Sequence, residues 1–271
     1  MKLGVMVYLR DTNIDERFKQ VKEYGFHSCQ LCGWQHDLFT DEVAKKVLEA
    51  CEKYDVSIST FWCGWGRPAV WNFYEGPLTL GLVPVEFRHA RIKELQMGSE
   101  FAKKLGVENM ATHVGFIPEV PVTEQYHSLI SAIRMVAQRC KDNGQYFLFE
   151  TGQETPVTLR RAIEDVGTGN LGINLDPANL ILYGKANPID ALDVFGEFVR
   201  DVHAKDGCYP TNGRELGEEK PLGEGKVDFP RFIKKLEEVG YDRTLTIERE
   251  ITGDQQIKDI MMAKSVLEKL I

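Results

Sequence analysis

The chain has 271 residues, 43% hydrophobic and 27% charged, a composition typical of one large or two small globular domains. A net charge of −8, from 33 basic and 41 acidic residues, argues against nucleic acid or an anionic membrane as the main partner. The longest apolar runs are too short to cross a membrane, no signal-peptide pattern opens the sequence, and six scattered cysteines do not suit a disulfide framework, so we expect a cytoplasmic protein.

Short apolar runs alternate with amphipathic segments along the whole sequence. Helical patterns occupy 14–25, 40–55, 88–106, 123–144, 228–240 and 254–270. The predicted strands are Leu3–Tyr8, His27–Leu31, Ser57–Trp62, Asn109–His113, Tyr146–Glu150, Leu171–Leu175, Val199–His203 and Leu245–Glu248. Eight strands alternating with helical segments predict an α/β fold, a single-domain (β/α)8 TIM barrel over residues 1–271.

An open doubly wound sheet is the main alternative fold. Such a sheet should carry a glycine-rich phosphate turn after its first strand, and residues 7–13 contain no glycine. The second predicted strand contains a Cys-x-x-Cys pair, Cys29 and Cys32. No second pair follows it, so we interpret both cysteines as strand residues rather than as a zinc or redox site.

The longest irregular stretch, about residues 63–88, follows the third predicted strand and contains Trp65, Trp71, Phe73 and Tyr74. In a barrel this segment would rise from the face that carries active sites. Long ordered loops in compact domains are usually lids or binding loops, and aromatic faces suit sugars. We predict that the loop covers the substrate and that Trp65 binds it. A small satellite core is the alternative interpretation.

Titratable side chains end or directly follow the last five predicted strands. They are His113, Glu150, Asp176, His203 and Glu248. The carboxyl ends of barrel strands converge on one mouth, where three carboxylates would repel one another unless a cation lay between them. Alone, Asp176 could simply cap a helix. Together the oxygen and nitrogen donors predict one divalent metal, Mn²⁺ first, with Mg²⁺, Co²⁺ or Zn²⁺ possible.

Two neighbours of these residues leave alternatives open. Glu248 and Glu250 point to the same side of a strand. We prefer Glu248 as the ligand because it directly follows the apolar run 245–247, and we expect Glu250 to support the site or pair with a basic group. Lys205 lies two residues after His203, just as Glu250 lies two residues after Glu248. It could contact a substrate oxygen or pair with an acid.

The segments FETG, NLDPANL, VHAKDG, PLGEGKVDF and TIERE resemble the sugar phosphate isomerase/epimerase family of xylose-isomerase-like TIM barrels. The resemblance covers nearly the whole chain. It implies that Glu150, Asp176, His203 and Glu248 bind the metal and that Glu150 and Glu248 serve as the acid/base pair.

The chain departs from two branches of that family. The apurinic endonuclease has a zinc-binding His where this chain has Asn179, and it has an Asp-x-His where residues 218–221 have no His. We therefore expect no nucleic acid partner and assign His113 and Asn179 as substrate contacts, with Lys205 and Glu250. The ketose 3-epimerases have an Arg near the position of Tyr209, so the resemblance does not specify that activity.

The chemistry that the resemblance implies is proton abstraction next to a carbonyl, through an enediolate. Protonation on the other face gives an epimerase, and protonation at the adjacent carbon gives an isomerase. Elimination of a β leaving group would instead give a keto-sugar dehydratase or lyase. We predict an isomerase acting on a small carbohydrate, in a chain that could form a homo-oligomer. A non-catalytic sugar-binding barrel is the alternative from another class.

Overall fold

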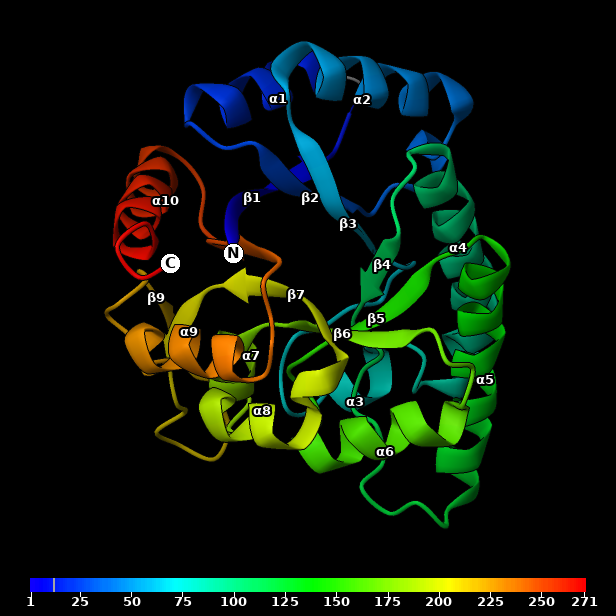
Figure 1. Cartoon of the computed structure of the whole chain (residues 1–271). Helices are drawn as coiled ribbons and strands as arrows, with labels where there is room; N and C mark the ends of the chain where they lie inside the picture. Colours follow the sequence, from blue (N-terminus) through cyan, green and yellow to red (C-terminus); the bar gives the residue numbers. More distant parts are fainter. Residues whose placement is uncertain (12) are drawn as a thin grey trace.

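The computed structural model describes residues 1–11 and 13–271, and its strands form a closed parallel barrel in the order β1-β10-β7-β6-β5-β4-β3-β2 (Figure 1). This confirms the predicted single-domain TIM barrel. The barrel strands are β1 (Lys2–Leu9), β2 (Ser28–Gly33), β3 (Ser57–Cys63), β4 (Asn109–Thr112), β5 (Tyr146–Glu150), β6 (Leu171–Leu175), β7 (Val199–Ala204) and β10 (Thr244–Ile247).

The helices are α1 (Ile14–Glu23), α2 (Asp41–Tyr54), α3 (Gly76–Thr79), α4 (Val85–Lys104), α5 (Glu124–Asp142), α6 (Pro156–Val166), α7 (Pro177–Leu182), α8 (Pro188–Phe195), α9 (Phe229–Glu238) and α10 (Asp254–Leu267). Most of them lie around the outer side of the barrel, whereas the short α3 belongs to the loop after β3 and lies near the centre of the view in Figure 1. Short 3₁₀ turns lie at His36–Leu38 and Gly196–Phe198.

Local signals in the sequence account for several helix starts. Thr40, Thr123 and Thr155 each accept a hydrogen bond from a backbone N–H of the first turn of α2, α5 and α6, as helix-capping residues do. Pro156 and Pro188 stand at the first position of their helices, where a missing N–H matters least. The apolar faces of the helices then pack against the strands in one large core.

The predicted strands occur where expected, with ends that differ by a few residues. The fourth strand ends at Thr112 and the eighth at Ile247, so His113 and Glu248 lie immediately beyond their strands. The predicted list lacked the antiparallel hairpin β8 (Asp206–Cys208) and β9 (Glu218–Lys220). A three-residue strand is too short to produce a recognisable alternation.

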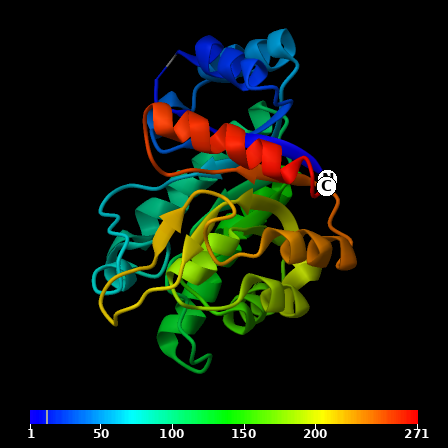
Figure 2. The same ribbon diagram turned by 90° about the vertical axis from the view of Figure 1, so that its left-hand side faces the viewer.

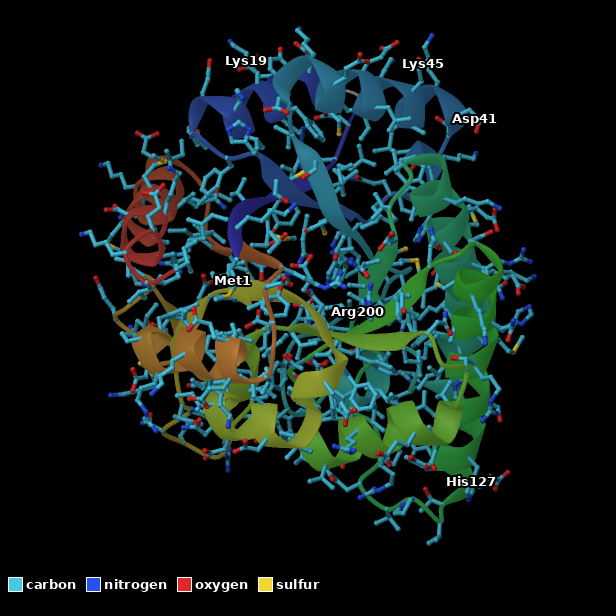
Figure 3. All side chains as sticks on the ribbon, viewed as in Figure 1. Met1, Lys19, Asp41, Lys45, His127 and Arg200 are labelled. Atoms are coloured by element: carbon cyan, nitrogen blue, oxygen red, sulfur yellow. The ribbon has the colours of Figure 1, made fainter. Side chains whose placement is uncertain are left out.

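Figure 2 shows both chain termini on one side of the molecule and the segment 63–84 and the β8–β9 hairpin on the other. The second side is the end toward which the barrel strands run, because β1 starts beside the N-terminus. The charged side chains of Lys19, Asp41 and Lys45 point outward from the helices, away from the barrel (Figure 3). Among the described residues, no helix is both long and apolar enough to cross a bilayer.

One carboxylate fastens the loop that follows the hairpin. Asp206 accepts hydrogen bonds from the backbone N–H groups of Gly207, Gly223, Gly225 and Val227, at 2.8 to 3.1 Å. A Cβ at position 225 would lie 2.0 Å from Asp206 Oδ1, which explains the glycine there. The PLGEGKV segment therefore wraps around a buried anion and holds the hairpin beside the mouth of the barrel.

Candidate metal centre

The four predicted ligands meet at the end of the barrel to which the strands run. Glu150 ends β5, Asp176 directly follows β6, His203 lies within β7 and Glu248 directly follows β10. All four side chains are buried, and each offers a donor atom that lies within 4.8 Å of the donor atoms of the other three. This spacing is compact enough for one metal ion to contact all four side chains.

His203 lies at the centre of this group. Its Nδ1 lies 3.1 Å from Glu248 Oε2, 3.4 Å from Glu150 Oε1 and 3.5 Å from Asp176 Oδ2. Its other ring nitrogen, Nε2, contacts two amide side chains, Gln30 at 2.9 Å and Asn174 at 3.0 Å. In the neutral tautomer in which Nε2 donates its proton to Gln30 Oε1, the lone pair of Nδ1 would face the three carboxylates, and this is the form that could bind a metal.

Asp176 combines the two roles considered for it, helix cap and candidate metal ligand. Its Oδ1 accepts a hydrogen bond from the N–H of Asn179 at 2.8 Å and so caps α7. Its Oδ2 is buried without a hydrogen-bond partner among the described residues, as is Nδ1 of His203. Buried polar atoms almost always have a partner. These two potential ligand atoms lack hydrogen-bond partners and lie near two further carboxylates, an arrangement that suits a divalent cation between the four groups.

Both glutamates are held by neighbouring donors. Glu150 Oε1 lies 3.3 Å from Nε2 of His113 and 3.4 Å from Nδ2 of Asn179. Its other oxygen, Oε2, accepts a hydrogen bond from the indole N–H of Trp62. Glu248 Oε1 accepts one from the hydroxyl of Tyr8 at 3.4 Å. Each carboxylate is therefore bound through both of its oxygens.

The charges in the site are strongly coupled. Burial by itself would raise the pKa of Glu150, yet His113 and His203 hold this pKa well below its usual value. Burial would lower the pKa of His203, whereas Glu248 and Glu150 raise it well above its usual value. The carboxylates are thus kept ionised beside a cationic imidazole, and a metal ion could replace that proton.

Lys205 occupies the side of the site next to Glu248. Its buried Nζ lies 3.1 Å from Glu250, 3.4 Å from Glu248 and 3.5 Å from Asp176, and it donates to Asn179 Oδ1 at 3.3 Å. Lys205 therefore pairs with acidic side chains, which is one of the two roles that the sequence left open for it. Glu250 in turn pairs with a basic group, Lys205, as the sequence suggested. Its side chain is 56% exposed, against 7% for Glu248.

A cavity of about 290 Å³ opens above these residues. Its lining is Met6, Tyr8, Cys32, Trp34, Trp62, Trp71, His113, Glu150, Asn179, Leu182, Tyr183, Leu216, Glu248 and Glu250. Trp65 is buried behind this wall, with its ring 5.3 Å from Trp34 and 6.2 Å from Trp62. Of the tryptophans in the 63–88 loop, Trp71 thus reaches the cavity, and Trp65 supports the wall.

Other hollows lie away from this chemistry. One of about 480 Å³ lies beside α1 and the start of α10, and none of the four candidate ligands lines it. Cys29 and Cys32 lie buried in β2 and are unpaired, and burial raises the pKa of both thiols well above the usual value. The site of the barrel mouth is therefore the one that the arrangement of donor groups supports.

The sequence prediction missed several residues of the site. Tyr8, Trp34 and Trp62 line the cavity, and Gln30 and Asn174 orient His203. Gln30 and Asn174 interrupt otherwise apolar strands, and polar groups inside a barrel need partners. That pattern was a usable signal. Their pairing with His203 depends on the closed order of the strands.

Comparisons with known proteins agree with this architecture. The family model described as "Xylose isomerase-like TIM barrel" matches residues 18–267. A protein of Methanocaldococcus jannaschii described as "Uncharacterized protein MJ1311" is 25% identical over 285 residues, covering 100% of this chain and 89% of its own length.

Among solved structures, a xylose isomerase domain protein from Planctomyces limnophilus has a TM-score of 0.93 at 32% identity, covering 99% of this chain and 96% of that one. A D-tagatose 3-epimerase-like protein has a TM-score of 0.74 at 22% identity, covering 100% and 97%.

More distant neighbours show the fold alone. The probable 3-DHS dehydratase AsbF from Bacillus anthracis has a TM-score of 0.71 at 18% identity, covering 99% of both chains. These structural neighbours thus include one protein named as epimerase-like and one named as a probable dehydratase. By its family match, its closed barrel and its likeness to the P. limnophilus protein, this chain belongs to the xylose isomerase-like TIM barrel family.

Proposed function

We propose that the protein is a divalent-metal-dependent sugar isomerase or epimerase that abstracts a proton next to a carbonyl. The observation that carries the proposal is the pair of buried glutamates, Glu150 and Glu248, on either side of His203. They come from β5 and from the end of β10, three strands apart in the barrel order. They therefore approach the cavity from different directions, as an acid/base pair must.

Glu150, Asp176, His203 and Glu248 would hold one divalent ion, with Mn²⁺ as the first candidate and Mg²⁺, Co²⁺ or Zn²⁺ as alternatives. When bound, the ion would supply Lewis-acid stabilisation of negative charge on the substrate oxygens. The orphaned Asp176 Oδ2 and His203 Nδ1 support this assignment. No sulfur donor belongs to the group, in keeping with a preference for oxygen-binding metals.

The two glutamates would divide the proton transfer between them. One carboxylate removes the proton from the carbon next to the carbonyl, which leaves an enediolate. The other returns a proton to the opposite face, giving an epimer, or to the adjacent carbon, giving an isomer. His113 and Asn179, which contact Glu150, and Lys205 and Glu250, beside Glu248, would bind and orient the substrate hydroxyls.

The cavity favours a small, uncharged carbohydrate. Its described lining contains the carboxylates Glu150, Glu248 and Glu250 and no Arg or Lys. The cation beneath it, Lys205, already faces three carboxylates. A phosphate group would thus meet acidic side chains without a free cation. The rings of Trp34, Trp62 and Trp71 offer apolar faces to the C–H groups of a sugar.

The segment of residues 63–88 would cover the bound sugar. Trp71 from this segment lies against the ring of His113, with centroids 5.0 Å apart, and lines the cavity. Tyr74 and Leu78 are largely exposed nearby in sequence. An exposed aromatic loop at the mouth of a barrel is typical of substrate-covering loops.

A cytoplasmic location is in keeping with the six unpaired cysteines.

A keto-sugar dehydratase is the second candidate, and Lys205 favours it. Its ammonium lies 3.4 Å from Glu248, so a positive charge stands next to the candidate base. This charge could stabilise a hydroxyl β to the carbonyl as it leaves with the proton that the base has taken up. Dehydration would form a conjugated product, whose ultraviolet absorbance can be monitored. Epimerisation would form no such product.

The test combines metal analysis with solvent-deuterium exchange. The metal-free protein is loaded with Mn²⁺ and incubated in D₂O with D-fructose, D-tagatose, D-psicose and 3-keto-glucosides. We expect deuterium at the carbon next to the carbonyl of at least one sugar, and none with the metal-free protein. Sugar binding by calorimetry without any exchange or product would instead show a non-catalytic sugar-binding barrel.

A further inference from the structure

The two candidate acid/base glutamates share one feature that their strands alone do not explain. Each carboxylate divides its two oxygens between two environments. Glu150 Oε1 and Glu248 Oε2 face His203 Nδ1, at 3.4 and 3.1 Å. The second oxygen of each carboxylate turns away from this cluster and accepts a hydrogen bond from an aromatic side chain.

The aromatic donors come from strands that carry none of the four candidate ligands. Tyr8 lies in β1, which pairs with β10, and its hydroxyl donates to Glu248 Oε1 at 3.4 Å. Trp62 lies in β3, and its indole N–H donates to Glu150 Oε2. Both side chains also line the cavity. The donors and the two carboxylates that they contact therefore share the wall of the cavity.

We propose that Tyr8 and Trp62 are positioning residues, which hold the second oxygen of Glu248 and of Glu150 so that each carboxylate offers a single oxygen to the metal cluster. A free carboxylate can rotate and offer both oxygens to one cation. A fixed second oxygen opposes that rotation and stays beside the cavity, where proton transfer would take place. This assignment rests on the proposed function only for its kinetic consequence.

The two hydrogen-bond donors, Trp62 and Tyr8, differ in how tightly their side chains are packed. The ring of Trp62 packs against Trp34 at 5.2 Å and against Trp65 at 6.2 Å, and the side chain is almost fully buried. Tyr8 is less buried, and the guanidinium of Arg10 covers its ring at 4.8 Å. An indole N–H can only donate, whereas a phenol hydroxyl can also accept. Trp62 is thus a fixed support, and Tyr8 is the donor that can be removed with little repacking.

The test removes one oxygen atom and reads the metal directly. Tyr8→Phe and the parent are loaded with Co²⁺ and compared by visible absorption spectroscopy, which reports the number and arrangement of ligand atoms. We expect the Co²⁺ spectrum of Tyr8→Phe to change, because Glu248 is free to offer its second oxygen. Mn²⁺ affinity, measured by calorimetry, should stay within about threefold of the parent, since all four ligands remain.

The matched control is Tyr54→Phe. It removes a tyrosine hydroxyl that also donates to a carboxylate, Asp15 Oδ2 at 2.9 Å, but on the surface. This variant should keep the parental Co²⁺ spectrum and parental exchange rates. Thermal melts of both variants exclude general unfolding as the cause. An unchanged Co²⁺ spectrum in a folded Tyr8→Phe protein would overturn the proposal.

The kinetic arm uses the sugar that exchanges fastest in D₂O. We expect Tyr8→Phe to lower kcat about tenfold, the scale of one hydrogen bond to a charged group, with KM little changed. Trp62→Phe should disturb Glu150 in the same manner, with an altered Co²⁺ spectrum. If the parent exchanges no sugar, the proposed reaction fails, whereas an altered spectrum in Tyr8→Phe still supports the positioning role. Parental kcat with a raised KM would contradict positioning and show a substrate contact instead.

Discussion

The ammonium nitrogen of Lys205 lies 3.1 Å from Oε2 of Glu250, and the same nitrogen lies 3.4 Å from Glu248 and 3.5 Å from Asp176. A single buried cation thus bridges an exposed carboxylate and two carboxylates of the candidate metal centre. Glu248 and Glu250 are therefore unequal: Glu248 faces His203, and Glu250 faces Lys205 and solvent.

The first prediction separates these two glutamates. Glu248→Gln keeps the size of the side chain and one oxygen but removes a base. Turnover should therefore fall by about a hundredfold or more, the usual scale for loss of a general base. Glu250→Gln should keep the full metal content and most of kcat, because its side chain is 56% exposed and lies outside the ligand group, while KM should rise because Glu250 lines the cavity. Steady-state kinetics and metal analysis of both variants check this.

An opposite result has a definite meaning. Loss of activity and metal in Glu250→Gln alone would show that the ligand of the eighth barrel strand lies two residues later. Glu150→Gln provides the companion measurement. Whichever variant retains the abstracting glutamate should still bring solvent deuterium into the substrate without completing the stereochemical change.

The second prediction concerns metal content. Asp176→Ala and His203→Ala each remove one of the two candidate ligands whose ligand atom has no hydrogen-bond partner in the part of the chain that the structure describes. We expect both variants to lose nearly all bound Mn²⁺ after gel filtration, measured by atomic absorption. His89→Ala removes an exposed histidine of α4 and is the matched control. Parental Mn²⁺ content in the Asp176 and His203 variants would show that the metal, if any, binds elsewhere.

Much of the fold could be predicted because its signals are local. Apolar strands, helical periodicity and capping residues such as Thr40 and Thr155 are read within a few residues. The ligand group also followed from a local rule, since each member lies at, or within one residue of, the end of a barrel strand. Helices α7 and α8 are short, six and eight residues, and short elements give weak periodicity.

The rest of the site depends on contacts between distant parts of the chain. Gln30 contacts His203 across 173 residues of sequence, and Tyr8 contacts Glu248 across 240. Both contacts follow from the order in which the strands close, with β1 beside β10. The burial of Trp65 and the cavity position of Trp71 likewise reflect the path of a loop without periodic structure. No pattern in the sequence alone specifies these pairings.

The third prediction concerns the loop of residues 63–88. Trp71→Ala should raise KM for the sugar several-fold and leave the melting temperature nearly unchanged, because Trp71 lines the cavity and is 38% exposed. Trp65→Ala is the informative comparison. Trp65 is 2% exposed, so its truncation should destabilise the protein by about 3–5 kcal/mol. Chemical denaturation and saturation kinetics measure both effects. Normal kinetics with lost stability in Trp71→Ala would support the satellite-core interpretation.

The last prediction concerns Glu154, four residues beyond Glu150. Its side chain is buried, its Oε1 has no hydrogen-bond partner among the described residues, and burial raises its pKa to about 7 from the ordinary value of 4.5. At pH values between these two pKa values, Glu154 of the folded protein holds a proton that the unfolded chain has released. Stability therefore decreases as pH rises from about 4.5 to about 7, by up to about 3 kcal/mol, and is level above that range.

Glu154→Gln removes this ionisation while keeping the size and polarity of the side chain. The variant should gain stability relative to the parent as pH rises, with the gain complete by about pH 8 and small near pH 4.5. Urea denaturation at a series of pH values measures the difference. Glu52→Gln, on the exposed face of α2, is the matched control for the exchange of Glu for Gln itself. A stability difference between Glu154→Gln and the parent that is the same at every pH would show that Glu154 does not release its proton near neutrality.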